Sequence, residues 1–404
     1  MASFSHYNFK NKKVLIRVDF NVPLDADMNI TDDTRIKASL ATITKVLQEG
    51  GSAILMSHLG RPKNGPVEKY SLKHLVSPVN KLLNEAMNSS VKLVFANDCR
   101  GEEVKLKAQA LQNGEVLLLE NLRFYKEEES GDEAFAKELA TLGDVYINDA
   151  FGTAHRAHAS TAVMAKYFSQ ENKMFGLLME KEVASAEKIL QAAKQPFVAI
   201  IGGAKVSDKI LILENLLEKA TDIIIGGGMA YTFIKAKGGE IGNSLCENEK
   251  LEIAKTILNK AAASSVQIHL PIDSIIANKF AANADTQEIE SEKIPAGWMG
   301  LDIGSKACHQ FKEVILRSNT ILWNGPMGVF EMEKFSNGTK QIAKSVAEAT
   351  ERGAFSLVGG GDSVAAINEL GFADKVSYVS TGGGALLEYF EGKILPGIAA
   401  INSK

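Results

Sequence analysis

The chain has 404 residues, of which 45% are hydrophobic and 23% are charged, and its formal net charge at pH 7 is −4. Because this length exceeds what one hydrophobic core typically holds, we expect two domains. The negative charge argues against a general nucleic-acid-binding surface. No apolar run is long enough to predict a membrane span, and the first residues show no signal-peptide pattern.

The cysteines give no sign of a metal site or a disulfide framework. Cys99, Cys246 and Cys308 are odd in number and far apart, and they form no CxxC pair. Unpaired cysteines of this kind are typical of a reducing compartment, so we expect a cytoplasmic location.

Apolar runs typical of buried β-strands alternate with helical patterns along most of the chain. Runs without polar alternation indicate strands that are covered on both faces. The predicted strands are residues 14–16, 53–56, 93–95, 116–119, 145–147, 197–201, 222–225, 267–270, 320–323, 355–358 and 376–379. Helical patterns such as 36–49 and 208–219 lie between them. This alternation predicts an α/β protein with two Rossmann-like domains, each a parallel sheet flanked by helices.

A helix over about residues 180–194, ended by Pro196, is the predicted connection between the domains. Apolar residues recur along it at helical spacing, and it lacks the Gly/Ser composition of a flexible linker. We therefore expect an N-terminal domain of residues 1–178 and a C-terminal domain of residues 179–392 that begins with this helix. A deep cleft is expected between the two domains.

Polar and glycine residues follow directly after several predicted strands. Asp19 and Asn21 follow the first strand, and His58 follows the second. Residues 202–205 and 359–362 follow strands of the second half in the same way. Ligands of open parallel sheets bind at the carboxyl ends of the strands, so these positions are expected to line ligand sites.

The loops of the N-terminal half carry a set of cationic residues. The residues are Arg35, Arg61, Arg123 and Arg156, together with His58. Arginine grips phosphate or carboxylate oxygens in pairs, so the set predicts a pocket for a small anion, whose hydroxyl groups Asp19 and Asn21 could bind. The alternative is that these are ordinary surface arginines paired with acids, and that His58 is a structural loop residue.

The C-terminal half carries glycine-rich turns at the starts of predicted helices. Lys205 and Lys209 stand four apart, which would place both on one helix face near a phosphate. Residues 359–363 would present backbone N–H groups to phosphates, with Asp362 placed to hold Mg²⁺. Residues 382–384 could form a second anion site. Alternatively the glycines only make tight turns and close packing, a strong competitor for residues 226–228.

Several common enzyme motifs are missing. The chain has no GxxxxGK[ST], no GxGxxG and no GxSxG pattern. Their absence argues against a P-loop NTPase, against the usual dinucleotide-binding fingerprint of a dehydrogenase, and against a nucleophile-elbow hydrolase. A doubly wound dehydrogenase or nucleotide-sugar enzyme, and a binding protein that has lost its activity, remain as competing hypotheses.

Taken in order, the motifs resemble the phosphoglycerate kinase family along essentially the whole chain. The matching segments are residues 17–23, 57–62, 120–124, 148–160, 202–209, 297–302, 323–331, 359–363 and 380–385. Two positions depart from the family pattern. Ser363 stands where threonine is common, and Leu386 stands where serine is frequent.

The resemblance implies a division of labour between the domains. The N-terminal domain would bind 3-phosphoglycerate or 1,3-bisphosphoglycerate through Asp19, Phe20, Asn21, Arg35, His58, Leu59, Gly60, Arg61, Arg123 and Arg156. The C-terminal domain would bind MgADP or MgATP through Lys205, Lys209, Gly300, Asn324, Glu331, Gly360, Gly361, Asp362 and Ser363. Mg²⁺ would be held mainly by the nucleotide phosphates, with Asp362 as its protein ligand. The tail, residues 393–404, would return to the N-terminal domain, and a monomer is implied.

The implied activity is that of a phosphotransferase with a carboxyl group as acceptor. The acyl phosphate of 1,3-bisphosphoglycerate passes its phosphoryl group to ADP, in line and reversibly, after hinge closure of the domains. Both possible nucleophiles are already ionised near neutral pH, so catalysis reduces to positioning and charge stabilisation. We expect Arg35, Lys205 and the N–H groups of Gly361 and Gly383 to stabilise the transferring group.

Overall fold

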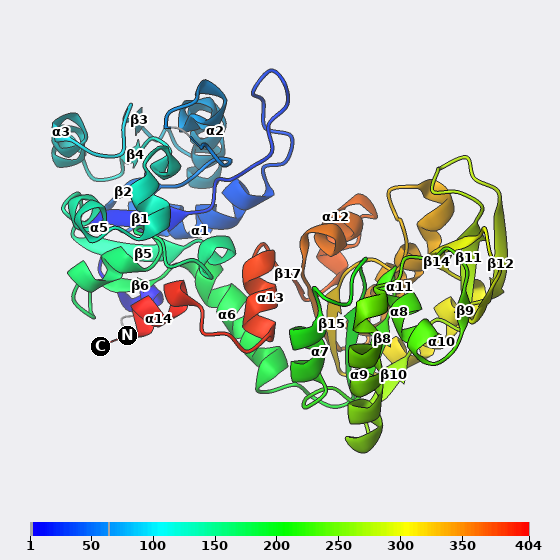
Figure 1. The fold of residues 1–404 in the computed structure, drawn as a ribbon. Coiled ribbons are helices and arrows are strands. Elements are labelled where there is room, and N and C mark those ends of the chain that lie inside the picture. The colour runs from blue at the N-terminus through cyan, green and yellow to red at the C-terminus, as the bar shows by residue number, and fades with distance from the viewer. Residues whose placement is uncertain (1–2, 64, 404) are drawn as a thin grey trace. The chain divides into compact units, whose positions relative to one another are not determined.

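The computed structural model describes residues 3–63 and 65–403 and forms two compact α/β units (Figure 1). Unit 1 contains the chain up to Val183 and again from Ile394, and unit 2 contains Ala184–Lys393. Of the predicted tail, residues 394–403 belong to unit 1, Lys393 belongs to unit 2, and Lys404 lies outside the described residues.

Unit 1 is built on a six-stranded parallel sheet with the order β3-β4-β2-β1-β5-β6. Its strands are β1 (Lys13–Val18), β2 (Ser52–Met56), β3 (Leu93–Phe95), β4 (Val116–Leu118), β5 (Val145–Asp149) and β6 (Lys173–Phe175). Its helices are α1 (Thr34–Gln48), α2 (Val76–Met87), α3 (Glu102–Ala110), α4 (Lys126–Ser130), α5 (Glu133–Ala140) and α14 (Pro396–Asn402). The buried strands explain the continuous apolar runs of the sequence.

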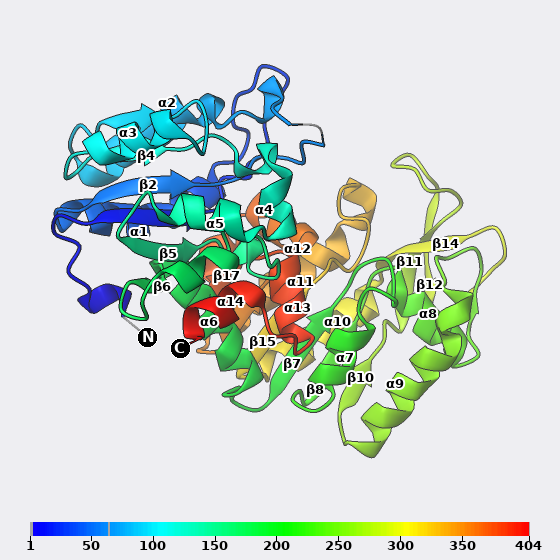
Figure 2. The ribbon, with the colours of Figure 1, turned by 60° about the vertical axis from the view of Figure 1, so that its left-hand side comes forward.

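The two faces of this sheet have different covers. Val14 and Ile16 on one face of β1 join a core cluster that includes Ile43 of α1 and Val79 of α2. Figure 2 shows α14, the last helix of the chain, beside β6, which it contacts. Gly397 donates its amide to the carbonyl of Ala154 at 2.8 Å, so a backbone hydrogen bond joins the tail to the loop after β5.

The connecting helix is observed as α6 (Leu177–Leu190), which starts and ends earlier than the predicted 180–194. It starts early because side chains of unit 1 receive its free amides: Leu177 donates to Thr42 Oγ1 at 2.9 Å and Met179 donates to Asp149 Oδ1 at 3.1 Å. Residues 191–194 form a turn and an irregular segment before Pro196. The boundary between the units lies within α6, after Val183.

Unit 2 has a second six-stranded parallel sheet with the order β10-β8-β7-β15-β16-β17. Its strands are β7 (Phe197–Ile201), β8 (Asp222–Ile225), β10 (Gln267–His269), β15 (Thr320–Asn324), β16 (Phe355–Val358) and β17 (Tyr378–Val379). Its helices are α7 (Ile210–Leu216), α8 (Met229–Ala236), α9 (Leu251–Ala263), α10 (Ser305–Leu316), α11 (Asn337–Glu351), α12 (Gly361–Glu369) and α13 (Gly384–Phe390). Trp323 is fully buried in the core of this unit.

Every predicted strand is present, and the prediction of two α/β domains with parallel sheets is confirmed. The apolar runs of the sequence did not predict β6 or a group of short strands in unit 2. These are the antiparallel sheet of β11 (Asp273–Ala277), β12 (Thr286–Glu290) and β14 (Met299–Ile303), and the pair β9 (Glu240–Ile241) and β13 (Lys293–Ile294). Most of β12 is exposed and polar, so no apolar run marks it. Among the described residues, no helix is long and apolar enough to cross a bilayer.

Candidate active site

The predicted site residues follow strands near the point of each sheet where the strand order reverses. In unit 1, β1 lies between β2 and β5, and in unit 2, β7 lies between β8 and β15. Asp19 follows β1, His58 follows β2 and Arg156 lies in the loop after β5. Loops that leave neighbouring strands in opposite directions open a crevice, the usual ligand position in such sheets.

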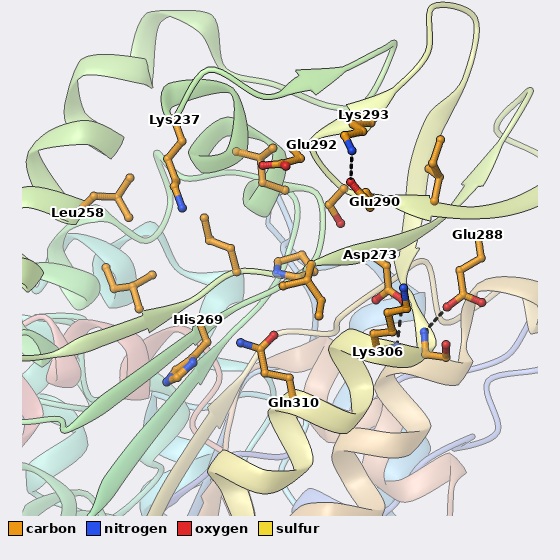
Figure 3. A pocket seen from close by; sticks show the side chains of 18 residues that line it. Lys237, Leu258, His269, Asp273, Glu288, Glu290, Glu292, Lys293, Lys306 and Gln310 are labelled. Carbon is orange, nitrogen blue, oxygen red and sulfur yellow. Dashed lines mark hydrogen bonds and ion pairs between the residues drawn. The ribbon is translucent and has the colours of Figure 1, made fainter.

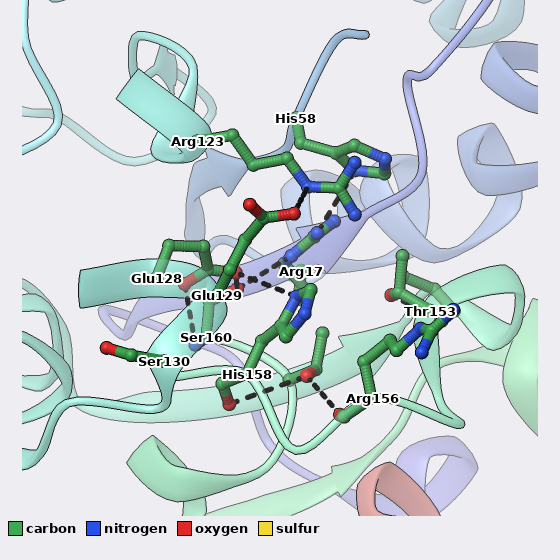
Figure 4. A network of polar contacts seen from close by, with 12 residues as sticks. Arg17, His58, Arg123, Glu128, Glu129, Ser130, Thr153, Arg156, His158 and Ser160 are labelled. Carbon is green, nitrogen blue, oxygen red and sulfur yellow. Dashed lines mark hydrogen bonds and ion pairs between the residues drawn. The ribbon is translucent and has the colours of Figure 1, made fainter. Parts of the chain in front are cut away.

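Arg17, at the end of β1, is fully buried and makes three side-chain hydrogen bonds (Figure 4). Its Nε donates to Ser160 Oγ at 2.8 Å, and its Nη2 lies 3.2 Å from His58 Nδ1. The carbonyl of Val18 accepts from Nη1. A buried guanidinium needs such partners, and here one of them is a predicted ligand-binding residue.

His58 sits among positive charges and is almost fully buried. Burial, followed by the charges of Arg17, Arg123 and Arg35, holds the pKa of its imidazole well below the usual range. His158 has the same character, since burial and the charges of Arg123 and Arg17 lower its pKa to about 4. Both histidines are therefore uncharged at neutral pH.

Arg35 stands in the first turn of α1 and reaches back to the loop after β1. Its Nη1 lies 3.0 Å from Asp19 Oδ2 and 3.3 Å from the carbonyl oxygen of Asn21. About a third of its side chain remains exposed, so the guanidinium can also meet a ligand. Asp19 is engaged by Arg35, and Asn21 Oδ1 accepts from the amide of Gly60 at 2.8 Å.

The other predicted substrate residues divide into ligand-accessible and structural groups. Arg123 donates from Nη1 to the carbonyl of Gly60 at 3.1 Å and pairs with Glu129 at 3.3 Å. Arg61 and Arg156 are exposed. Phe20 and Leu59 are buried, so their side chains support the loops instead of presenting a polar group.

Sequence reasoning missed several residues that organise this cluster. Arg17 lies in the matching segment 17–23 directly after the predicted strand 14–16, and no local pattern marks it as a buried side chain. Glu128, His158 and Ser160 come from the segment after β4 and β5 and are all buried. Arg17 and Ser160 are 143 positions apart, and no local pattern signals their contact.

Unit 2 contains a pocket of about 510 Å³ whose walls are largely glycine backbone and apolar side chains. Three predicted nucleotide-binding residues line it: Gly300, Glu331 and Asp362. Leu245 and Phe280, which are 49% and 60% exposed, also line it. Apolar walls with three carboxylates, those of Asp302, Glu331 and Asp362, suit an aromatic base with a polar, metal-bearing end.

The turn after β16 is a glycine turn that opens α12. Gly360 adopts a positive φ of 94°, and a Cβ there would lie 2.4 Å from Asn324 Nδ2. That amide donates to the carbonyl of Gly359 at 2.7 Å, while Asn324 Oδ1 accepts from Lys209 Nζ. Ser363 is buried and its Oγ accepts from the amide of Gly325. Nothing within 4 Å would meet a Cβ on Gly361 or Gly383, so a ligand can approach both backbones.

The expectation that Lys205 and Lys209 share a helix face is wrong. Residues 202–209 form an irregular segment and a turn, and α7 begins only at Ile210. Lys205 is exposed, whereas Lys209 is partly buried and burial lowers its pKa. The i, i+4 rule does not apply here, because Lys205 and Lys209 both lie in the segment between β7 and the start of α7.

The glycines at 226–228 serve close packing. A Cβ on Gly227 would lie 2.5 Å from the carbonyl oxygen of Gly203, and one on Gly226 would lie 2.3 Å from Met327 Sδ. The alternative that the sequence left open, tight turns without a ligand-binding role, accounts for Gly226 and Gly227. Gly227 and Gly228 still contribute backbone to the pocket wall.

A larger pocket of about 980 Å³ in unit 2 is lined by many charged residues (Figure 3). Lys237 and Gln310 enter it from α8's end and from α10. Its charges are largely matched within the pocket: Lys293 pairs with Glu290, and the start of α10 donates amides to Asp273 and Glu288. None of the predicted site residues lines it.

Comparisons with known proteins agree with the geometry. The sequence profile of the phosphoglycerate kinase family matches residues 4–393. Phosphoglycerate kinases from Porphyromonas gingivalis and Chloroherpeton thalassium are each 52% identical to this chain, over 99% and 98% of both sequences, respectively. A solved structure of phosphoglycerate kinase from Coxiella burnetii superposes with a TM-score of 0.87 at 41% identity, covering 98% of each chain. The chain therefore belongs to the phosphoglycerate kinase family of glycolytic phosphotransferases.

Proposed function

We propose that this chain transfers the acyl phosphoryl group of 1,3-bisphosphoglycerate to MgADP, giving 3-phosphoglycerate and ATP, and that it catalyses the reverse reaction. The observation that carries the proposal is the arginine cluster around neutral His58 in unit 1, in a chain whose unit 2 holds a glycine-walled pocket. The first suits a small anion with phosphate and carboxylate groups, and the second suits a nucleotide. A cytoplasmic, monomeric enzyme is part of the proposal.

In unit 1, the phosphoglycerate ligand would be held by arginines, of which Arg123 is the most buried. Arg35 and Arg123 are already oriented by Asp19 and the Gly60 carbonyl, so little side-chain entropy is lost on binding. Arg61 and Arg156 are exposed and free to swing onto phosphate oxygens. Asn21 is the candidate for contact with a ligand hydroxyl, through the amide nitrogen left over when its Oδ1 accepts from Gly60.

In unit 2, the pocket lined by Gly300 and Glu331 would take the adenosine of ADP or ATP. Lys205, Lys209 and the start of α12 would face its phosphates, because N–H groups at a helix start favour anions. Asp362 is exposed at the pocket wall and fits Mg²⁺. No group of three or more metal-ligating side chains occurs among the described residues, so most of the ion's ligands would come from the nucleotide and water. When bound, Mg²⁺ would neutralise phosphate charge.

The reaction needs no strong general base, which suits two neutral histidines. Both nucleophiles, a carboxylate and an ADP phosphate oxygen, are ionised at neutral pH. The protein's task is therefore to align donor and acceptor and to stabilise charge on the transferring group. We assign that charge stabilisation to Arg35 and Lys205, with the N–H groups of Gly361 and Gly383.

The test is Arg35→Ala in an assay that couples 1,3-bisphosphoglycerate formation from 3-phosphoglycerate and MgATP to NADH oxidation by glyceraldehyde-3-phosphate dehydrogenase. Loss of a donor to the transition state typically costs about 3 kcal/mol, so kcat should fall roughly a hundredfold or more. Lys37→Ala is the matched control, because Lys37 lies on the same helix and pairs with Asp33. If Arg35→Ala has an unchanged kcat and only a raised KM, Arg35 contributes to substrate binding and not to the chemical step.

A further inference from the structure

His58 is held from one side by a chain of buried hydrogen bonds that begins at Glu128 in α4. Ser160 donates its hydroxyl to Glu128 Oε1 at 2.5 Å and its amide to Glu128 Oε2 at 3.0 Å. Arg17 Nε donates to the same serine Oγ at 2.8 Å. All three side chains are fully buried, so solvent does not compete for these bonds. We call Glu128, Ser160 and Arg17 the Arg17 relay (Figure 4).

The direction of each bond in the relay is determined by its donors. Arginine only donates, so Ser160 Oγ must accept from Arg17, and its single proton goes to Glu128. Glu128 accepts at both oxygens, as a carboxylate does, and its negative charge offsets the buried guanidinium. The relay therefore has one consistent arrangement of protons.

The same logic extends to the imidazole. Arg17 Nη2 lies 3.2 Å from His58 Nδ1, so Nδ1 must accept and carries no proton. With a proton at Nδ1, the N–H groups of Arg17 and His58 would point at each other, and neither could accept a hydrogen bond. The proton of the neutral ring is then on Nε2, and no described residue makes a hydrogen bond to that nitrogen.

We propose that Glu128, Ser160 and Arg17 are positioning residues that hold His58 as the neutral Nε2–H tautomer, so that His58 is an uncharged hydrogen-bond donor to the anion bound in unit 1. The proposal rests on the proposed function, because it takes that anion to be 3-phosphoglycerate. In this tautomer His58 donates one hydrogen bond in a defined direction and adds no positive charge to the site. An imidazolium would be repelled by the nearby charges of Arg35 and Arg123.

The tautomer can be read without substrate. In protein labelled with ¹⁵N-histidine, two-bond ¹H–¹⁵N correlation spectra separate a protonated ring nitrogen from an unprotonated one. The chain has seven histidines, and the signals of His58 are identified as the set that disappears in a His58→Gln variant. We expect His58 to show an Nε2–H tautomer that does not titrate between pH 5.5 and 8, a range set by the usual pKa of about 6.5. An Nδ1–H tautomer, or a protonated ring at pH 7, would overturn the proposal.

The relay itself is tested by Ser160→Ala, which breaks the link between Glu128 and Arg17 and keeps both charges. We expect His58 to show a mixture of both tautomers. The KM for 3-phosphoglycerate should rise up to about tenfold, because one hydrogen bond to the ligand is weakened, and kcat should change less. Glu128→Gln replaces one acceptor oxygen with an NH₂ donor and removes the charge that offsets Arg17, so it should give both changes at least as strongly. Ser345→Ala removes another buried serine hydroxyl, in unit 2, and should change neither. If Ser160→Ala has the same unfolding transition as the wild type and the His58 spectrum is unchanged, the Arg17 relay does not position His58.

Substrate addition separates this proposal from the proposed function. If 3-phosphoglycerate shifts the Nε2–H signal of His58 in the wild type, the donor role is supported. If the tautomer is as expected and 3-phosphoglycerate is turned over without moving that signal, the donor role fails while the kinase activity stands. If neither binding nor turnover occurs, the proposed function fails, and the tautomer result still decides the relay.

Discussion

At the residue scale, the chain keeps several ionisable side chains in its interior and gives each a specific partner. Asp222 is almost fully buried at the start of β8, where His269 Nε2 lies 2.7 Å from Oδ1 and Arg317 Nη2 lies 2.6 Å from it. These partners lower its pKa although burial opposes them. Asp149 is the contrasting case, because among the described residues no cation lowers its pKa.

Asp149 makes unit 1 sensitive to pH. Burial raises its pKa from 3.8 to about 7, and the hydrogen bonds from Thr42 and from α6 amides only partly oppose this. Between these values the folded chain holds a proton that the unfolded chain releases, so the free energy of unfolding should fall as pH rises from 4 through 7. At about 1.4 kcal/mol per pKa unit, the full effect is on the order of 4 kcal/mol. Asp149→Asn keeps an acceptor for the Met179 amide and should abolish this fall.

The measurement is hydrogen exchange of β1 amides across this pH range, corrected for intrinsic rates, because β1 lies at the centre of unit 1 and reports its opening. Tryptophan fluorescence would not serve, since Trp298 and Trp323 both belong to unit 2. Asp27→Asn, at an exposed carboxylate, is the control. Equal pH profiles for the wild type and Asp149→Asn would show that Asp149 ionises as an ordinary carboxylate.

At the element scale, the site is assembled from strand ends and the turns that follow them. The turn after β16 illustrates this, because it must reverse direction, start α12 and leave its amides open within three residues. Gly360 meets the requirement with a positive φ, and its close approach to Asn324 links it to Lys209. Leu386, the departure from the family pattern, packs against this turn, where a Cβ on Gly359 would lie 2.2 Å from its Cδ2.

Gly360→Ala should therefore weaken nucleotide binding beyond its cost in stability. The new methyl group would displace Asn324 and with it the phosphate-facing start of α12. The matched control is Gly353→Ala, which has a similar positive φ of 102° and no atom near its Cβ. Both variants should lose about 1 kcal/mol from backbone strain, but only Gly360→Ala should raise the Kd for MgADP in titration calorimetry, roughly tenfold or more. Equal affinities for the two variants would show that the turn is not part of the nucleotide site.

At the scale of the whole molecule, the chain crosses from unit 1 to unit 2 in α6 and returns at Ile394. Each unit has its own parallel sheet and its own core clusters, so each can move as a body. The two substrates of the proposed reaction are assigned to different units. Direct transfer requires donor and acceptor to meet without water between them.

We therefore expect the radius of gyration from small-angle X-ray scattering to decrease when 3-phosphoglycerate and the non-hydrolysable MgATP analogue AMP-PNP are both bound. Either ligand alone should give a smaller change, because only the pair joins the two half-sites. Scattering of Arg35→Ala, which keeps the other arginines, tests whether closure depends on the contact between Arg35 and the transferring phosphoryl group. Identical scattering for the free and doubly liganded protein would contradict the hinge proposal.

Much of the fold could be predicted because parallel strands buried on both faces leave continuous apolar runs, as at β7 and β8. The same reasoning could not find β12, whose polar residues face solvent and pair only with β11. The helical spacing expected for Lys209 fails for a similar reason, because the turn that holds it precedes α7. Edge strands and helix starts depend on neighbours, and their local patterns are weak.

Two α/β domains, the arginines and glycine turns after their strands, and a resemblance that the family comparisons confirm could all be read from the amino-acid sequence. These follow from local hydrophobic patterning and from turn chemistry, which a one-dimensional sequence records. The burial of Arg17 between Ser160 and His58, and the hydrogen bond from the start of α6 to Asp149, come from tertiary packing. Such environments arise when residues far apart in the chain exclude water together, and the resulting charges, tautomers and pKa values have no local signature.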